Sequence, residues 1–234
     1  MERKARPDLV HLGNGIKPNV DGVVAARRLG IPCIAHEKGL VRYTPFDRLW
    51  CKRVAASVSM TEAIRRHLLQ QGVHAPRMVV APDGLDLEHH IPTRPREQTR
   101  AALGIAPADL VVGMTVNVQP WKGQEVLLRA LHRLEGEGLK PVCVLAGGVV
   151  RGAEWYQQQL EDFVRAKHLV GRVKFLGSRS DIPDLQHAFD VQVHASITPE
   201  PFGRVLIEAM AMRLPLVASN AGGVPEIVID GETG

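Results

Sequence analysis

Aromatic residues are scarce in this 234-residue sequence, at 4% of the total. Proteins that bind single-stranded nucleic acid stack bases on aromatic side chains, so we expect no nucleic-acid partner. No apolar run approaches the ~18 residues of a membrane-spanning helix. None follows the charged N-terminal Met1-Glu2-Arg3-Lys4 either, so no signal peptide is predicted. The 45% hydrophobic and 23% charged residues are typical of a folded globular protein.

Cysteine is also rare, and its pattern argues against a disulfide framework. The three cysteines, Cys33, Cys51 and Cys143, are odd in number and scattered along the chain. Cys33 and Cys143 lie within apolar runs. We therefore expect buried free thiols in a protein of the reducing cytoplasm.

Positive charge is concentrated in the first part of the chain. Residues 1–100 contain 17 Lys and Arg against 10 Asp and Glu, whereas residues 101–234 contain 12 against 15. A basic half can face nucleic acid, anionic lipid or an acidic substrate, and it is also typical of solvated helix faces. Solvated helix faces are the favoured interpretation, and peripheral contact of the basic half with the inner face of an anionic membrane is the functional alternative.

Strand-like and helix-like segments alternate along the whole chain. Short apolar runs predict strands at residues 9–12, 31–35, 55–59, 78–81, 111–116, 142–146, 173–176, 191–194 and 215–218. Because these runs are apolar throughout rather than alternating, we expect parallel sheets buried on both faces by helices. The sequence therefore predicts an α/β fold.

The segments between the strands carry helical periodicity. Leu127, Leu128, Leu131 and Leu134 share one face of a predicted helix, and residues 156–164 repeat the pattern. Capping-box spacing at residues 59 and 62 predicts another helix that begins just after residue 59. The proline-rich segment 82–96 breaks the alternation and predicts a linker between two domains, residues 1–91 and 92–234.

The segment from Ser196 to Met210 carries the strongest chemical signal. It follows a predicted strand, contains two prolines, and begins a helix near Phe202 or Gly203. The unpaired backbone N–H groups of a helix start bind anions, and a glycine there allows close approach. Glu200 precedes this helix start, and Glu208 lies on the apolar helix itself. Two carboxylates flanking an anion site suit a ligand with hydroxyl groups on both sides of a diphosphate, such as a nucleotide sugar.

A second polar segment, from Asn117 to Gly123, follows the predicted strand 111–116 and contains Lys122. Ligands of open α/β sheets bind beyond the carboxyl ends of the strands. A lysine at that position can neutralise a phosphate, although a lysine in a surface turn would have the same sequence context.

The sequence resembles the retaining glycosyltransferases of family 4, also called group 1, which have the GT-B fold. Glu200 and Glu208 are separated by seven residues that include Pro-Phe-Gly, and Glu-Ala-Met-Ala follows, which is the hallmark of that family. Further similarity lies at residues 82–86, 117–130, 173–177 and 221–228. The resemblance implies two doubly wound Rossmann-like domains with parallel sheets: an incomplete acceptor-side domain over residues 1–91 and a donor-binding domain over residues 92–234. It also implies that the chain is a fragment.

The resemblance assigns roles to individual residues. Lys122 would bind the donor diphosphate, Glu208 the ribose hydroxyls, and Glu200 the hydroxyls of the donor sugar. His36, after the strand at 31–35, resembles a family histidine that faces the donor sugar, which makes His36 and Glu200 the candidate catalytic residues. A structural histidine at a strand end is the alternative for His36.

The remaining donor-binding roles are carried by backbone and loop positions. The backbone at Phe202, Gly203 and Arg204 would hold the sugar and the phosphates, and Gly177 begins a loop near the nucleobase. Asn117 stands where the family often has arginine, which predicts weaker diphosphate binding or recruitment of Arg204.

The resemblance predicts metal-independent, retaining transfer from a UDP- or GDP-linked sugar to a glycan, lipid-linked or small-molecule acceptor, with no cofactor. No Asp-x-Asp pair is present, and neither His89-His90 nor His187 with His194 has the acidic or cysteine partners of a metal site. Two alternatives stay open: a sugar-nucleotide-binding module without turnover, and another GT-B enzyme such as a sugar-nucleotide epimerase.

Overall fold

The computed structural model describes residues 7–234, so the N-terminal Met1-Glu2-Arg3-Lys4 lies outside the described residues. The chain forms two compact units. The first unit runs to Gly84 and also includes two later segments, Pro199–Phe202 and Ala221–Glu226. The second unit consists of Leu85–Thr198, Gly203–Asn220 and Ile227–Gly234.

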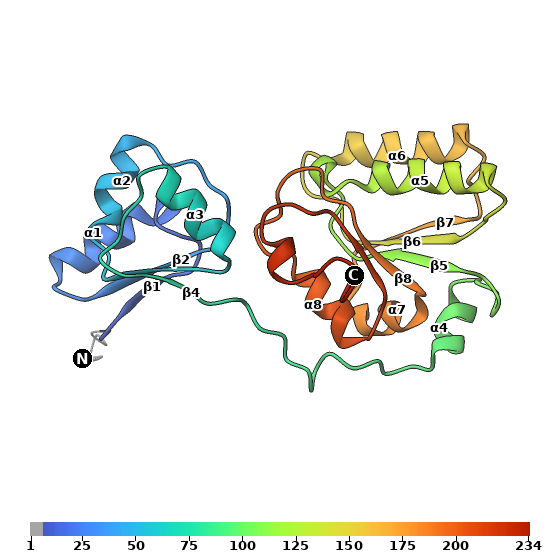
Figure 1. The fold of residues 1–234 in the computed structure, drawn as a ribbon, viewed down its shortest axis with the longest axis horizontal. Helices are drawn as coiled ribbons and strands as arrows, with labels where there is room; N and C mark the ends of the chain where they lie inside the picture. The colour runs from blue at the N-terminus through green and yellow to red at the C-terminus, as the bar shows by residue number, and fades with distance from the viewer. Residues whose placement is uncertain (1–6) are drawn as a thin grey trace, which may run out of the picture. The chain divides into compact units, whose positions relative to one another are not determined.

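The first unit contains a four-stranded parallel sheet in the order β1-β2-β3-β4. Its helices follow the first three strands in turn and lie on one face of the sheet (Figure 1). Right-handed crossovers that always advance in one direction produce this arrangement. The elements are β1 (Val10–Leu12), α1 (Val20–Arg28), β2 (Cys33–Glu37), α2 (Pro45–Cys51), β3 (Ala56–Ser59), α3 (Glu62–Gln70) and β4 (Met78–Val80).

Burial along the strands of the first sheet differs from the sequence prediction. We expected strands buried on both faces, but burial alternates along β2, where Cys33, Ala35 and Glu37 are buried and Ile34 and His36 are half-buried. The pattern of β3 alternates in the same way. The physical reason is that the helices cover a single face, so every second side chain points away from them.

The start of α3 also differs from the predicted capping box. Ser59 is the last residue of β3, so it cannot cap the helix. Thr61 is the cap, and its hydroxyl accepts a hydrogen bond from the backbone N–H of Ile64 at 3.2 Å. Glu226, from the later segment of the first unit, accepts the backbone N–H groups of Glu62 and Ala63 at 2.7 Å each. A carboxylate at this position complements the helix dipole.

The second unit contains a five-stranded parallel sheet in the order β7-β6-β5-β8-β9. Helices α5 and α6 lie on one face, and α4, α7 and α8 lie on the other (Figure 1). The elements are α4 (Arg96–Ala102), β5 (Val111–Met114), α5 (Gln124–Gly136), β6 (Val142–Ala146), α6 (Glu154–Ala166), β7 (Val173–Gly177), α7 (Ile182–Ala188), β8 (Val191–His194), α8 (Arg204–Ala211) and β9 (Leu216–Ala218).

Hydrophobic cores on both faces bury the central strands of this sheet. Every residue of β5 and β6 is buried, as predicted for a sheet between two helix layers. Leu127, Leu128 and Leu131 of α5 pack in the core on one face, and Leu185 and Phe189 pack in the other. The predicted helical face is therefore confirmed at Leu127, Leu128 and Leu131, whereas Leu134 is half-buried.

The predicted linker carries no regular element before α4, yet its second half is held in place. The backbone N–H groups of Thr93 and Arg94 donate to Asp184 of α7 at 2.6 and 2.9 Å. The guanidinium of Arg94 contacts the same carboxylate at 3.0 Å. His90 lies 3.0 Å from the side chain of Gln186. These contacts join residues 90–94 to the second unit.

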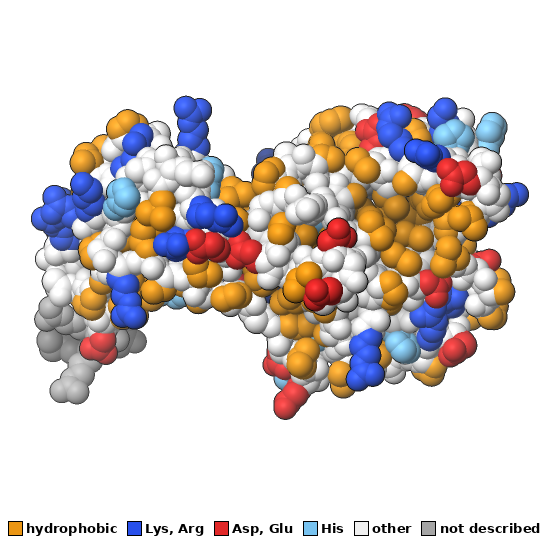
Figure 2. All heavy atoms as spheres, viewed as in Figure 1, with side chains coloured by type: hydrophobic (Ala, Val, Ile, Leu, Met, Phe, Trp, Pro, Cys, Tyr) orange, Lys and Arg blue, Asp and Glu red, His pale blue; other side chains and the backbone are white. Residues whose placement is uncertain are grey.

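A hydrophobic groove of about 520 Å³ lies between α5 and strands β8 and β9. Figure 2 shows hydrophobic side chains gathered on the second unit in this region. Val126 and Val217, which line the groove, are 48% and 60% exposed. Across residues 7–234, no helix is long and apolar enough to cross a membrane.

The three cysteines are free and buried, as predicted. Burial raises the pKa of the Cys51 and Cys143 thiols to about 12, and it raises that of Cys33 as well. They are therefore thiols rather than thiolates at neutral pH, which makes them poor nucleophiles.

Candidate active site at the carboxyl edge of the second sheet

The order of the second sheet reverses beside β5. From β5 the chain proceeds outward through β6 to β7, and it then returns to build β8 and β9 on the opposite side. The helices that follow β5 and β8, α5 and α8, therefore lie on opposite faces of the sheet (Figure 1). Such a switch point leaves a crevice at the carboxyl ends of the strands, where α/β proteins bind their ligands. Both segments singled out in the sequence, 117–123 and 196–210, begin at this edge.

The loop after β5 packs tightly against the end of β8. Gly123 has φ of +77°, and a Cβ atom added to it would lie 1.9 Å from the carbonyl oxygen of Ala195. The backbone N–H of Ile197 donates to the carbonyl of Trp121 at 2.9 Å. Only glycine permits both this conformation and this approach. The two loops are therefore held together by backbone contacts.

Lys122 lies at the end of a short 3-10 helix, Pro120–Lys122, in this loop. Its Nζ lies 3.9 Å from the centroid of the Trp121 ring, and the indole N–H of Trp121 donates to Gln119 at 2.7 Å. A cation over an aromatic ring is held in place without losing its charge. Asn117, at the beginning of the loop, is exposed, and its carbonyl accepts the side-chain amide of Gln124 at 2.9 Å.

Helix α8 begins where the sequence predicted. Its N-cap is Gly203, at φ of +92°, and the first residue of the helix is Arg204. Because the N-cap is a glycine, it has no side chain that could accept a hydrogen bond from the first backbone N–H groups of the helix. Val205, Leu206 and Ala209 are buried, which orients this amphipathic helix against the sheet.

Glu208 lies one turn along α8 and pairs with Arg204. The guanidinium Nε of Arg204 contacts Oε1 of Glu208 at 3.1 Å, with the two side chains 68% and 18% exposed. Burial raises the pKa of Glu208 above its ordinary value, and the charges of Arg204 and His90 oppose this shift. A half-buried carboxylate beside a cation suits an acceptor of hydrogen bonds from hydroxyl groups.

The boundary between the two units passes through the Glu200 motif. Glu200 and Phe202 are buried and belong to the first unit, whereas Gly203, Arg204 and Glu208 belong to the second. Glu200 forms an isolated parallel bridge with Gly222, and its carbonyl accepts the N–H of Gly223 at 2.7 Å.

The neighbouring Pro201 is held within the same unit. Its carbonyl accepts the hydroxyl of Thr61, the cap residue of α3, at 2.9 Å. Gly223 lies close by, since an added Cβ atom would lie 2.4 Å from that carbonyl. The segment that carries Glu200 is thus fixed through its backbone.

Gly177 ends β7 at the same edge of the second sheet. It has φ of +64°, and its carbonyl accepts the N–H of Gly147 at 2.8 Å. Gly147 in turn approaches the loop after β5, since an added Cβ atom would lie 1.9 Å from the carbonyl of Val116. The loops that follow β5, β6 and β7 are therefore in contact with one another through their backbones.

His36 occupies the penultimate position of β2, in the sheet of the first unit. Its ring stacks on His11 with centroids 5.8 Å apart, and its Nε2 is buried without a partner among the described residues. Burial chiefly lowers the pKa of His36, Lys38 lowers it further, and Asp83 opposes the shift. A depressed pKa keeps the ring neutral at physiological pH.

Three polar residues at the candidate site were not identified from the sequence. His194 at the end of β8 is buried, and its two ring nitrogens lie 3.2 Å from the hydroxyls of Ser196 and Ser219. The ring therefore joins the loops after β8 and β9. His194 was considered only as a metal ligand, and the serines 2 and 25 residues away carried no spacing signal.

The described part of the chain was searched for side chains that could bind a metal ion together. No group of three or more His, Cys, Asp or Glu there is arranged to hold a metal ion. His89 instead contacts Asp86 at 2.9 Å.

Comparison with known proteins supports the same class of fold and identifies the family. Residues 95–234 match the family described as glycosyl transferases group 1, and residues 1–89 match glycosyltransferase family 4. A D-inositol 3-phosphate glycosyltransferase of Rhodococcus jostii is 32% identical over 215 residues, which are 90% of this chain and 44% of the relative. A putative glycosyltransferase EpsF of Bacillus subtilis is 30% identical over 213 residues, covering 85% and 54%.

Solved structures agree with the sequence relatives. The crystal structure of Anabaena Alr3699/HepE in complex with UDP-glucose superposes with a TM-score of 0.86 at 32% identity, over 96% of this chain and 63% of that one. Sucrose-phosphate synthase from Thermosynechococcus elongatus has a TM-score of 0.82 at 23% identity and shows likeness of fold alone.

The fold and the matches place the chain in the GT-B fold class with Rossmann-like domains. The chain belongs to the family of glycosyl transferases group 1. It spans about half, or less, of the length of the curated relatives named above.

Proposed function

We propose that this protein transfers a sugar from a UDP-linked donor to an acceptor, with retention of the anomeric configuration and without a metal ion. The observation that carries the proposal is the packing of the Lys122 loop against the end of β8 at the switch point of the sheet. Helix α8 begins in the segment that follows β8. The choice of UDP rests on the Anabaena protein, whose structures contain UDP and UDP-glucose.

In this proposal, charge on the donor diphosphate is met by the protein alone. Lys122 and the N-terminal N–H groups of α8 supply fixed positive charge and dipoles. Arg204 adds mobile charge, because its side chain is largely exposed and its partner Glu208 is one turn away. Charge on the leaving diphosphate grows in the transition state, so Arg204→Ala lowers kcat more than donor affinity.

The other roles follow the resemblance. Glu208 accepts hydrogen bonds from the ribose hydroxyls, Glu200 contacts the donor sugar, and Gly177 lies in the loop near the nucleobase. Asn117 contributes a neutral hydrogen-bond donor toward the diphosphate, and the backbone of Phe202 and Gly203 holds sugar and phosphate. His36 acts as a neutral ring toward the donor sugar, in keeping with the downward shift of its pKa. The acceptor is a glycan or a lipid-linked glycan, and the basic first unit contacts an anionic membrane.

The first test is donor binding measured by thermal unfolding. UDP-glucose at 100 times its Kd raises the free energy of unfolding by about 2.7 kcal/mol, and GDP-mannose at the same concentration serves as the control. Stabilisation by GDP-mannose alone would change the proposed nucleobase of the donor from uracil to guanine.

The second test follows the product. Transfer to a glycan acceptor in the presence of EDTA, with NMR assignment of an anomeric centre that keeps the donor configuration, supports the proposal. Activity lost to EDTA and restored by manganese would defeat the metal-free mechanism. Donor binding without any transfer favours a binding module, and a changed sugar nucleotide without acceptor favours an epimerase.

A further inference from the structure

A hollow of about 330 Å³ lies where helices α5 and α6 begin, side by side on one face of the second sheet (Figure 1). Residues from the first two turns of each helix line it, together with Pro120, Gly123 and Ile197 of the adjoining loops. Its volume falls within the range of about 300–1,000 Å³ that is typical of small-molecule sites. None of the described side chains that line it has a role in the proposed transfer reaction.

One side of the hollow is an exposed aromatic ring. Trp155 and Ile197, which both line the hollow, are 60% and 62% exposed. The indole of Trp155 packs edge-on against the buried ring of Tyr156, with ring centroids 5.7 Å apart and 62° between the planes. A large ring that is fixed in place yet open to water is typical of a binding site, because it offers much contact area at a low cost in conformational entropy.

A network of hydrogen bonds holds the polar side chains of the hollow. The guanidinium of Arg129 donates through Nε and Nη2 to Oε1 of Glu125 at 3.0 and 2.6 Å, and the side-chain amide of Gln159 donates to Oε2 at 3.0 Å. The hydroxyl of Tyr156 accepts the backbone N–H of Glu125 at 3.1 Å. Arg129 also lies over the ring of Phe163, with its guanidinium carbon 5.4 Å from the centroid. These contacts hold hydrogen-bond donors and acceptors in place beside the indole.

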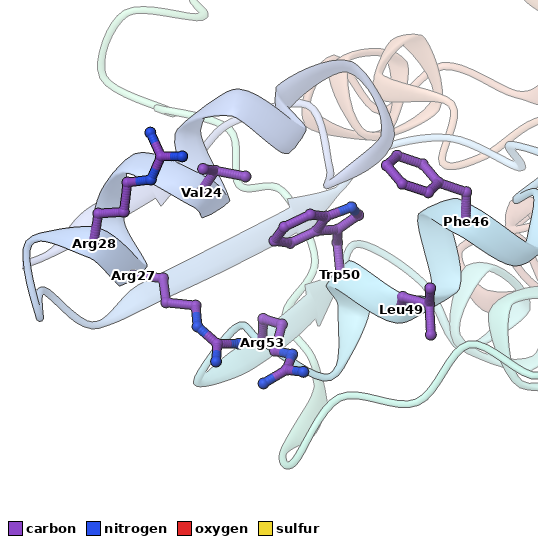
Figure 3. Close-up of a pocket in the computed structure, with 7 residues that line it drawn as sticks. All are labelled: Val24, Arg27, Arg28, Phe46, Leu49, Trp50 and Arg53. Carbon is purple, nitrogen blue, oxygen red and sulfur yellow. The ribbon is translucent and has the colours of Figure 1, made fainter.

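The charges of this hollow are balanced. Its charged residues among 7–234 are Glu125 and Arg129, which form an ion pair at 2.6 Å. The hollow between α1 and α2 of the first unit is different, because three arginines line it, Arg27, Arg28 and Arg53 (Figure 3). A surface with charges of one sign attracts ligands of the opposite sign, whereas a balanced surface favours a neutral polar ligand.

We propose that the hollow at the start of α5 and α6 is a binding site for a neutral glycan, separate from the site of sugar transfer. The C–H groups on one face of a pyranose ring carry partial positive charge and pack on the negative face of the Trp155 indole. The sugar hydroxyls both donate and accept, so they bond to the polar network around Glu125. A purely apolar ligand would strip water from that network without replacing its hydrogen bonds, and an anion would be repelled by the carboxylate.

The experiment is an NMR titration of the isotope-labelled full chain with three neutral hexasaccharides: maltohexaose, cellohexaose and mannohexaose. The chain has three tryptophans, and the indole resonance that is lost in W155A identifies Trp155. At least one hexasaccharide shifts this resonance and the backbone N–H resonance of Ile197, and leaves the indole resonance of Trp50 unchanged. No sugar donor is present, so the result does not depend on the proposed transfer reaction.

The aromatic side of the site is tested by W155A. This variant loses about tenfold in affinity for the hexasaccharide, followed at the N–H resonance of Ile197, and W155F, which keeps a ring, loses less than about threefold. The matched control is F46A, which removes an aromatic ring of the same 60% exposure from the first unit and leaves the affinity unchanged.

The polar side of the site is tested by R129Q. Loss of this donor lowers the affinity for the hexasaccharide about fivefold. The matched control is R133Q, because Arg133 lies one turn further along α5 and also pairs with a glutamate four residues away. R133Q leaves the affinity unchanged. Each variant retains the circular dichroism spectrum and the UDP affinity of the unchanged chain, because these side chains lie outside the candidate active site.

Three results would overturn the proposal. The first is an unchanged Trp155 resonance with all three hexasaccharides. The second is an equal loss of affinity in W155A and F46A, which would show that exposed aromatic surface matters in general and not this hollow. The third is a shift of the Trp155 resonance by uridine in the absence of any shift by a hexasaccharide. That result would assign the hollow to a nucleobase.

Discussion

The first sheet follows chain order from β1 to β4, whereas the second reverses between β5 and β8. A single winding direction places the helices of the first unit on one face, and burial alternates along β2 and β3. The reversal places helices on both faces of the second sheet, and β5 and β6 are buried throughout. Winding direction therefore decides both how the strands are buried and which sheet contains a topological switch point.

The carboxyl edges of the two sheets also differ in their charges. At the edge of the first sheet, Glu37 is 2% exposed and accepts the hydroxyl of Tyr43 at 2.7 Å and the backbone N–H of Ile16 at 3.2 Å. Lys38 pairs with Asp83 at 3.8 Å. At the second edge, Lys122 lies over a tryptophan ring and Glu208 is raised in pKa by burial. Glu37 of the first edge is therefore held by neighbours in its own unit, whereas the partly buried Glu208 of the second edge pairs with the largely exposed Arg204.

The largest effect is expected from Gly123→Ala, which tests whether close packing defines the second edge. The new methyl group would lie 1.9 Å from the carbonyl of Ala195, in a backbone conformation that side chains disfavour. We expect a loss of about 3–5 kcal/mol in the free energy of unfolding, measured by urea denaturation. Gly171→Ala, at φ of +87° with open space around it, is the matched control and loses about 1–2 kcal/mol. Equal losses would mean that the contact with Ala195 is unimportant.

Lys122→Ala is expected to have the next largest effect, on ligand binding. Loss of a charge-assisted contact weakens UDP binding by about 1.5–3 kcal/mol and leaves uridine binding unchanged in calorimetry. Lys38→Ala, at the carboxyl edge of the first sheet, is the control and leaves the affinities for UDP and uridine unchanged. If Lys38→Ala weakens UDP binding as much as Lys122→Ala does, the distinction between the two edges fails.

Glu208→Gln is expected to have a smaller effect, because the amide keeps the shape and one acceptor oxygen. Exchanging a charged acceptor for a neutral one weakens UDP binding by about 1 kcal/mol. Binding of 2′,3′-dideoxy-UDP is insensitive to the substitution, because that analogue lacks the hydroxyl groups. An equal loss for the dideoxy analogue would exclude Glu208 as the ribose contact.

The smallest effect is a shift in pH dependence. Protonated Glu208 is a weaker acceptor, so UDP affinity falls as the pH decreases through the pKa of Glu208, which burial places above the ordinary 4.5. Arg204 opposes that shift, so Arg204→Ala raises the pKa of Glu208 and moves the loss of affinity to higher pH. Calorimetric titrations across the acid range measure the midpoint, and Glu208→Gln removes the transition. A midpoint that moves to lower pH in Arg204→Ala would contradict this assignment.

Local sequence patterns were sufficient for the nine strands found within residues 7–234, because each is a short apolar run bounded by turn residues. The start of α8 was likewise predictable, since Pro201 and Gly203 mark it in the sequence. The cap of α3 was assigned wrongly because Ser59 and Thr61 are both acceptable cap residues. The pairing of β3 with β2 and β4 shows that Ser59 is still in a strand. The one-sided burial of β2 was missed because the winding direction of the chain decides which faces of the sheet the helices cover. An apolar run in the sequence does not encode that direction.

The candidate site was predictable where charge and helix starts lie together in the sequence, as at Lys122 and Glu208. The contact between Gly123 and Ala195 joins positions 72 residues apart, and nothing local requires it. His194 contacts Ser219 only because β8 and β9 are neighbours in the sheet. Such contacts depend on strand order, which propensities of single residues leave open.

The division of the chain between its units has a practical consequence for the choice of expression boundaries. Because Pro199–Phe202 and Ala221–Glu226 belong to the first unit, the chain passes from one unit to the other several times. A cut in the linker near residue 90 would give an N-terminal piece whose helix α3 has lost Glu226 from its first turn. The same cut would leave the C-terminal piece with Glu200 and Pro201 deprived of the surface formed by Thr61. Excising either half as an independent module therefore removes part of its own packing.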